Sequence, residues 1–376
     1  MTKRTLLATA AMTALGAGSV AAGNLDLTKT PIDLIFEEGN YAELSYALVT
    51  PSVTGRDLLG NSISNVANDF SVIGSGIKFQ LTDALSFAII QDQPYGVDVQ
   101  YNSDPATTLL GRTMAHAETN ALTLLARYQT GNGFSVYGGP RVVRAKGEVT
   151  LSGLAYGGPP GTALNGYNVK FLSDQATGYV MGASYEIPDI AFRAALTYHS
   201  EVELDMPAFE TFPGAPGAIS LGDTKTKLPQ SVKLQVQSGI ATDTLAFGSI
   251  RWAEYSVFTL DPPSGPAPNL TELDDAWTYE IGLGRRFTDK LSGSISYTYE
   301  DEEGNDLVSP LAPTKGRQIL SVGAEYQVTE AVTLSGGVRY IWIGDAIAET
   351  GTPDAPRANF TGNDAMTFGM KVGISF

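Results

Sequence analysis

From about residue 40 to the C-terminus, apolar and polar side chains alternate with a period of two, the pattern of β-strands with two unlike faces. The segment MTFGMKVGISF (366–376) carries bulky apolar side chains on one face and Thr, Gly, Lys and Ser on the other, and VTLSGGVRYIW (332–342) repeats the arrangement. A soluble β-sandwich buries its bulky face in a shared core and exposes charges. Here the second face is rich in Gly and Ser, which is typical of a barrel interior whose outer face meets lipid.

The connections between these segments alternate between short and long. Four short turns share a Thr followed by an acid: LTDAL (81–85), ATDTL (241–245), FTDKL (287–291) and VTEAV (328–332). Between them lie long segments rich in Pro and Gly, such as LSGLAYGGPPGTALNGYN (151–168). This asymmetry indicates an outer-membrane barrel with tight periplasmic turns and larger extracellular loops.

The predicted fold class is therefore all-β, a transmembrane antiparallel β-barrel of about fourteen strands with a short N-terminal hatch in its lumen. Strands are expected near 41–50, 70–81, 84–93, 119–129, 133–149, 178–187, 191–204, 229–240, 244–260, 277–287, 291–300, 316–328, 331–344 and 365–376. The segment 23–40 has no long alternating run of its own. The expected organisation is thus a hatch over 23–40 and a barrel over 41–376.

The N-terminus and the composition restrict the compartment and the chemistry. Lys3 and Arg4 precede an apolar, Ala-rich run that ends in small residues, which predicts a signal peptide over 1–22 and export. No later run approaches the roughly 20 apolar residues of a membrane helix. The absence of cysteine excludes disulfides, thiolate catalysis and Cys-type zinc sites. A net charge of −16 argues against a nucleic-acid partner.

The stretch QDQPYGVDV (91–99) interrupts an otherwise regular strand pattern. Proline has no N–H for a sheet and glycine weakens a strand, so pairing is expected to break around Pro94 and Gly96. From the turn before this strand, Pro94 is expected roughly 25 Å up, near the outer side of the apolar band. The residues assigned to the break are Asp92, Gln93, Pro94, Tyr95 and Gly96. An ordinary bulge where the strand leaves the membrane is the alternative interpretation.

Three parts of the chain together resemble a known family: PIDLIFEEGNYAELSYALVTPSVTG (31–55), SFAIIQDQPYGVDVQY (86–101) and the strand-turn register up to Phe376. They look like the long-chain fatty acid transporters of the outer membrane, the FadL/OMPP1/TodX family. The resemblance implies a fourteen-stranded barrel, a hatch that plugs the lumen, internal hydrophobic binding sites and a kinked third strand that opens sideways. The break over 92–96 would be this lateral gate, and Glu37, Glu38, Gly39 and Asn40 would belong to the hatch. The Asn-Pro-Ala hatch element of many members is absent, so details of hatch movement do not transfer.

The expected function is passive transport of long-chain fatty acids or similar hydrophobic molecules, with no enzymatic activity and no cofactor or metal. A general aqueous porin is the main alternative, although the 23–40 segment would obstruct a water-filled pore. A barrel-embedded lipase using His116, His199 and a serine such as Ser200 is a third, but the chain has no G-x-S-x-G elbow. The acidic stretch YEDEEGND lacks the ligand spacing of an EF-hand and is expected to be a solvated loop.

Strand parity places a set of basic side chains in the lumen. A carboxylate head group in a partly dry channel needs such a partner, whereas the simpler interpretation is that Arg–Glu pairs brace the barrel and hold the hatch. The candidate ligand-binding cations are Lys78, Arg127, Arg193, Lys233, Arg251, Arg339 and Lys371.

The remaining expectations concern partners and location. The protein is expected in the outer membrane of a Gram-negative bacterium, as a monomer surrounded by lipid and lipopolysaccharide. Its C-terminal Phe376 is expected to engage the barrel assembly machinery.

Overall fold

The computed structural model of the chain describes residues 26–28, 31–214, 219–264, 269–302, 307–351 and 353–376. The predicted signal peptide over 1–22 and residues 23–25 and 29–30 of the predicted hatch lie outside these ranges. Within them, no helix is long and apolar enough to span a membrane.

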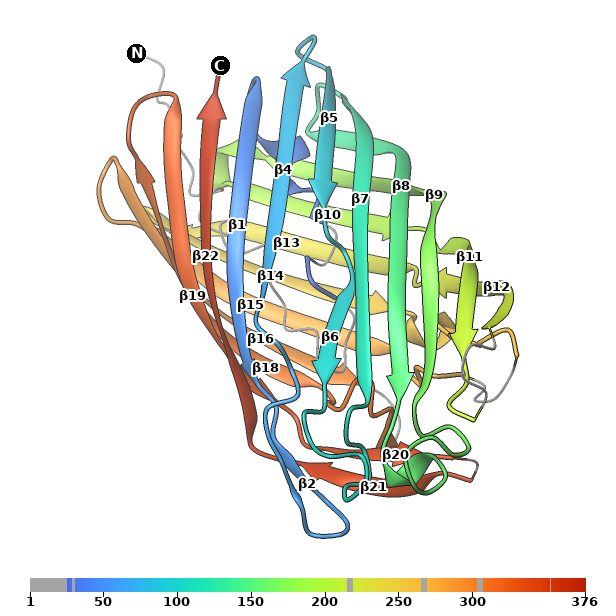
Figure 1. The fold of residues 1–376 in the computed structure, drawn as a ribbon. Coiled ribbons are helices and arrows are strands. Elements are labelled where there is room, and N and C mark those ends of the chain that lie inside the picture. Colours follow the sequence, from blue (N-terminus) through green and yellow to red (C-terminus); the bar gives the residue numbers. More distant parts are fainter. Residues whose placement is uncertain (1–25, 29–30, 215–218, 265–268, 303–306, 352) are drawn as a thin grey trace.

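The chain forms one large antiparallel sheet that closes on itself, because β1 pairs with both β22 and β4 (Figure 1). Three of its wall strands are each divided into two elements: β5 and β6, β10 and β11, and β12 and β13. The wall therefore has fourteen strands, which confirms the predicted all-β barrel. Its elements are β1 (Tyr41–Ser52), β4 (Phe70–Gln80), β5 (Leu85–Asp92), β6 (Gly96–Gln100), β7 (Met114–Gln129), β8 (Phe134–Leu151), β9 (Tyr167–Ile187), β10 (Phe192–His199), β11 (Val202–Thr211), β12 (Ile219–Leu228), β13 (Ser231–Ala241), β14 (Thr244–Ala253), β15 (Ala276–Arg286), β16 (Leu291–Glu302), β18 (Arg317–Gln327), β19 (Val332–Ile343) and β22 (Asn363–Ser375).

A second, small sheet and four short 3₁₀ turns complete the described chain. The sheet contains β17 (Leu307–Val308), β20 (Ala346–Thr350), β21 (Ala355–Phe360), β2 (Gly55–Asp57) and β3 (Ser62–Ile63). It lies at the end of the barrel that carries the long loops, opposite the short turns and the C-terminus (Figure 1). The turns are η2 (Asp33–Phe36), η3 (Leu154–Tyr156), η4 (Pro188–Ile190) and η5 (Tyr255–Val257).

The two faces of the wall differ as the sequence pattern predicts. At the middle of β19, Val338 lies beside Val322 of β18 and Phe368 of β22, and all three side chains are exposed on the outer face. Their neighbours on the inner face, such as Thr367 and Lys371, are buried. Because the outer face must meet hydrocarbon, its apolar side chains remain exposed without a protein core against them.

The expected strand ends are wrong at the end of the barrel with the long loops. β9 begins at Tyr167 instead of near 178, β7 begins at Met114 instead of near 119, and β12 was not expected at all. These extensions lie beyond the apolar band, where the outer face carries charges such as Lys225 and Lys227, so the apolar half of the alternation is lost. β14, in contrast, ends at Ala253 instead of near 260.

We expect Val338→Arg to impair assembly of the barrel, because a charge on the lipid face near the midplane costs about 2–4 kcal/mol. Ser249→Arg is the matched control, since Ser249 lies on the inner face of β14 and its hydroxyl already contacts Glu280 at 3.5 Å. The heat-modifiable folded fraction in outer membranes measures the difference. Equal folded fractions for the two variants would contradict this assignment of the faces.

Candidate functional site

The barrel wall is interrupted between β5 and β6. β5 pairs with β4 on one side and β7 on the other, and its pairing with β4 ends at Gln91 opposite Ser75. β6 pairs with β7, and no described residue of β4 pairs with it. The backbone hydrogen bonds between neighbouring wall strands are therefore interrupted around Pro94, between residues 70–74 of β4 and the start of β6.

Backbone groups around the interruption are satisfied by side chains and by the N-terminal segment. The amide of Ile73 on β4 donates to Oε1 of Gln93 at 3.0 Å, so a side chain replaces the missing strand contact. The amide of Tyr95 donates to Oγ1 of Thr119 at 2.8 Å, and the amide of Leu27 donates to the carbonyl of Pro94 at 2.8 Å. Unpaired backbone groups in lipid are costly. The 93–95 segment is thus held from inside the barrel.

The interruption lies at the outer boundary of the apolar band. In the β7 register, Asp92 lies opposite Ala121 and Gly96 opposite Glu118. On the side toward the short turns, the outward Leu122 and Leu124 are exposed. On the other side, Glu118 forms an exposed ion pair with Lys146 at 3.0 Å. The break therefore lies where the hydrocarbon-facing surface gives way to a charged one.

An apolar pocket of about 40 Å³ lies directly inside this break. Tyr95 and Gly96 form one wall of the pocket, and fully buried Leu204 on β11 belongs to the opposite one. The other lining residues are Ala117, Thr119, Ala145, Lys146, Gly147, Phe171, Met206, Thr226, Leu228, Phe258 and Leu260. Aromatic and aliphatic side chains dominate this lining, which suits an apolar ligand.

A larger, polar cavity of about 180 Å³ lies in the lumen. Five of the seven predicted cations line it: Arg193, Lys233, Arg251, Arg339 and Lys371. Glu43 and Glu280 share its surface, and Nζ of Lys371 lies 3.2 Å from the Glu43 carboxylate. Thr28 and Leu34 of the N-terminal segment also contribute to its wall.

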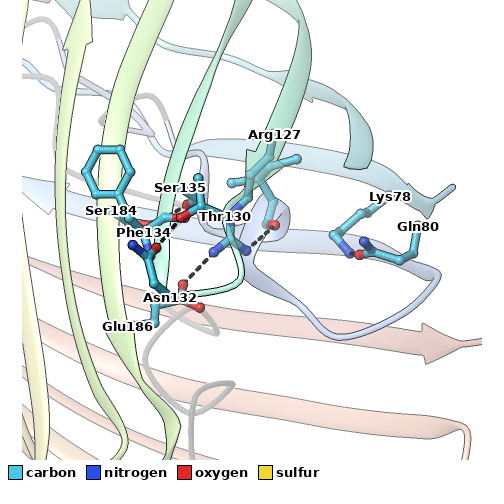
Figure 2. A network of polar contacts seen from close by, with 10 residues as sticks. Lys78, Gln80, Arg127, Thr130, Asn132, Phe134, Ser135, Ser184 and Glu186 are labelled. Carbon is cyan, nitrogen blue, oxygen red and sulfur yellow. Dashed lines mark hydrogen bonds and ion pairs between the residues drawn. The ribbon is translucent and has the colours of Figure 1, made fainter. Parts of the chain in front are cut away.

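The other two predicted cations contact the N-terminal segment and the barrel wall (Figure 2). Nζ of Lys78 donates to the carbonyl of Gly39 at 2.9 Å and to Gln80 at 2.7 Å. Arg127 donates to Glu186 at 2.7 Å, to Ser135 at 3.0 Å and to the carbonyl of Ile35 at 3.4 Å.

The ring of Phe36 in the N-terminal segment contacts two guanidinium groups. The ring is 4.8 Å from the Arg127 guanidinium and 4.3 Å from that of Arg193. Such cation–π contacts contribute about 0.5–1 kcal/mol each at exposed sites and more when desolvated.

The predicted hatch residues lie where this segment meets the first strands. Oδ1 of Asn40 accepts the Gln80 amide at 2.9 Å, and Gly39 adopts a φ of 62°. Glu37 is half-buried and Glu38 is exposed.

The start of the segment is anchored by a buried charge network that sequence reasoning missed. Asp26 is fully buried and accepts hydrogen bonds from Arg251 at 2.5 Å and from the Tyr255 hydroxyl. Thr28 donates to Asp92 at 2.8 Å, and Arg141 lies 3.4 Å from the same carboxylate. Asp26 and Thr28 lie in a segment without periodicity, so no pattern in the sequence marked them.

The residues of the alternative lipase hypothesis are not brought together. His116 lies on the outer face of β7, 2.9 Å from Glu118. His199 is buried, and Ser200 accepts the amide of Tyr179 at 2.8 Å. The described residues thus form no Ser-His pair with hydrogen-bond geometry.

Comparisons with known proteins agree with this architecture. The family model described as outer membrane protein transport protein (OMPP1/FadL/TodX) matches residues 9–376, whereas no curated protein matches the chain. A Pseudomonas aeruginosa FadL homologue is similar in structure, with a TM-score of 0.74 at 16% identity, over 96% of this chain and 98% of that one.

Two toluene transporters are also similar. The Pseudomonas putida transporter TodX has a TM-score of 0.67 at 14% identity, over 96% of this chain and 99% of that one. The Ralstonia pickettii transporter TbuX has a TM-score of 0.65 at 14% identity, over 96% and 98% of the two chains. The chain therefore belongs to the OMPP1/FadL/TodX family of transport proteins and lies in the outer membrane of a Gram-negative bacterium.

Proposed function

We propose that the protein passively transports long-chain fatty acids or similar hydrophobic molecules, and releases them sideways into the membrane through the break beside Pro94. The observation that carries the proposal is that Tyr95 and Gly96 belong both to the break in the wall and to the lining of the apolar pocket. A ligand leaving the pocket there enters the membrane at the outer boundary of the apolar band. It thereby bypasses the polar lipopolysaccharide layer.

Widening the break costs little free energy. Between β4 and the 93–95 segment, the hydrogen bond from the Ile73 amide to the Gln93 side chain replaces the backbone hydrogen bonds of a regular strand pair. A hydrogen bond of this kind contributes about 0.5–1.5 kcal/mol net, so passage of an apolar ligand does not require a strand to be stripped from the sheet. We therefore assign the gate to Asp92, Gln93, Pro94, Tyr95 and Gly96.

The polar cavity would receive the head group of an amphiphile such as a fatty acid. Arg251 and Lys371 already contact carboxylates of the protein. Lys233, in contrast, lines the cavity and has no ion pair or side-chain hydrogen bond within the described ranges. Its ammonium group is thus the cation best placed to meet a carboxylate that enters the lumen.

The named relatives support the substrate class. One is a FadL homologue and two are toluene transporters. Long-chain fatty acids and small aromatic hydrocarbons share an apolar body, which suits the apolar lining of the pocket. We infer binding and diffusion without covalent chemistry. An aqueous porin is disfavoured, because residues 26–28 and 31–40 contact lumenal side chains of several strands.

Filling the apolar pocket should block transport while leaving the barrel intact. We expect Ala117→Leu to reduce uptake of labelled oleate sharply in cells that lack other transporters, because the added methyl groups occupy the space between Ala117 and Gly147. Ala126→Leu is the matched control, since Ala126 lies on the lipid face of the same strand and should leave uptake unchanged.

Uptake at the wild-type level by a correctly folded Ala117→Leu protein would show that the ligand does not pass through this pocket. Toluene uptake by the same variants would then be measured, to separate loss of one substrate from loss of transport altogether.

A further inference from the structure

Three carboxylates from two extracellular segments converge outside the barrel lumen. Glu349 ends β20, Asp354 lies in the turn before β21, and Glu272 belongs to the long connection between β14 and β15. Each residue offers one carboxylate oxygen, and these oxygens all lie within 4.8 Å of one another. Two oxygens that each lie about 2.4 Å from one calcium ion can be no farther apart than this.

Glu349 is buried without a partner for one of its oxygens. The residue is 7% exposed, and its Oε2 atom has no hydrogen-bond partner among the residues that the structure describes. A buried, unpaired carboxylate costs several kcal/mol, so such a group normally pairs with a cation or takes up a proton. The neighbours here are two further carboxylates, which make the cost larger.

Glu349 lies at an irregularity in the pairing of the small sheet. The pairing of β20 with β21 shifts register between Ala348 and Glu349, and both of these consecutive residues are buried. In a regular strand consecutive side chains point to opposite faces. The residue left unpaired by the irregularity is Arg357 on β21, and beside it Ala348 and Glu349 are both covered, whereas Glu272 and Asp354 remain exposed and open to water.

Burial and the neighbouring carboxylates raise the pKa values of Glu349 and Glu272. Burial, and then Asp354 and Glu272, raise the pKa of Glu349 to about 7. Burial and then Asp354 also raise the pKa of Glu272. Both shifts describe carboxylates crowded by like charge, which a divalent cation would relieve.

We propose that Glu272, Glu349 and Asp354 bind a calcium ion that fastens the β14–β15 connection to the small extracellular sheet. The donor set is entirely carboxylate oxygen, which is the chemistry that calcium prefers, and water would complete its coordination on the exposed side. The connection is already held near this sheet, because Ser309 donates to the carbonyl of Leu270 at 2.8 Å. Calcium would therefore add a cross-link at the outer end of the barrel.

Titration calorimetry with CaCl₂ tests the proposal on the full-length barrel in detergent free of lipopolysaccharide. We expect one site with a dissociation constant on the order of 10⁻⁴–10⁻³ M, as in extracellular calcium modules. Glu349→Gln should lose this site, whereas the matched control Glu203→Gln, on the exposed face of β11, should retain it.

Two further variants keep the test independent of folding. Glu272→Gln and Asp354→Asn alter exposed side chains, and each should weaken binding at least about tenfold while the heat-modifiable barrel persists. The absence of calcium binding by the wild-type protein would overturn the proposal. Equal binding by the wild-type protein and all three cluster variants would also overturn it.

Discussion

Replacing Gln93-Pro94-Tyr95-Gly96 by Thr-Val-Tyr-Thr should reduce oleate uptake to the level of cells without the transporter, while the barrel still folds. The replacement supplies the N–H that Pro94 lacks and removes the Gln93 amide that now accepts from Ile73. A Cβ atom at position 96 would lie 2.8 Å from the end of the Leu27 side chain, which would have to shift. The straightened strand could then pair with β4 and close the wall.

A second strand proline provides the matched control for this experiment. Pro140 lies within β8, where two pairs with β7 are missing but the register is kept on both sides of them, and the strand still pairs with β9. Pro140→Val should therefore leave oleate uptake unchanged. Hydrogen exchange at the amides of residues 70–74 would establish that the four-residue variant is straightened. Wild-type uptake by a variant with newly protected amides would exclude a gate at this position.

The comparison of these two prolines shows what sequence reasoning can and cannot supply. Both interrupt an alternating run, so the missing N–H predicts a local irregularity at either position. Whether a proline interrupts the pairing between wall strands depends on the register of the neighbouring strand and on the residues that pack against the proline from the lumen. Pro94 is backed by Leu27 and an apolar pocket. That information resides in contacts between distant segments, which alternation does not encode.

For the inward-facing cations, too, the sequence predicts the position of the side chain but not its contacts. Strand parity predicted the lumenal position of Arg251 and Lys371, because lipid tolerates no charge on the opposite face. Their partners were not predictable, since Asp26 lies 225 residues before Arg251 in a segment without periodicity. The barrel itself could be predicted because alternation within the apolar band is obligatory. Beyond that band polar side chains occupy the outer face, and there the strand ends were wrong.

The anchoring of the N-terminal segment leads to the last prediction, that Arg251→Met opens the lumen to ions. Asp26 is fully buried, and its carboxylate depends on Arg251 and the Tyr255 hydroxyl. Removing one partner of a buried ion pair costs about 3–5 kcal/mol, because the remaining charge is uncompensated. The least costly response is for residues 26–28 to leave the lumen, which would raise ion conductance in planar bilayers.

Deletion of residues 24–36 sets the upper limit for this conductance, and Arg286→Met provides the control. Arg286 pairs with Asp243 at an exposed turn, where an ion pair contributes about 0–1 kcal/mol, so its loss should leave conductance unchanged. A deletion variant that conducts no better than the wild-type protein would show that the segment does not obstruct the pore. If instead the deletion conducts and Arg251→Met does not, the segment plugs the lumen but contacts such as Phe36 with Arg127 and Arg193 hold it.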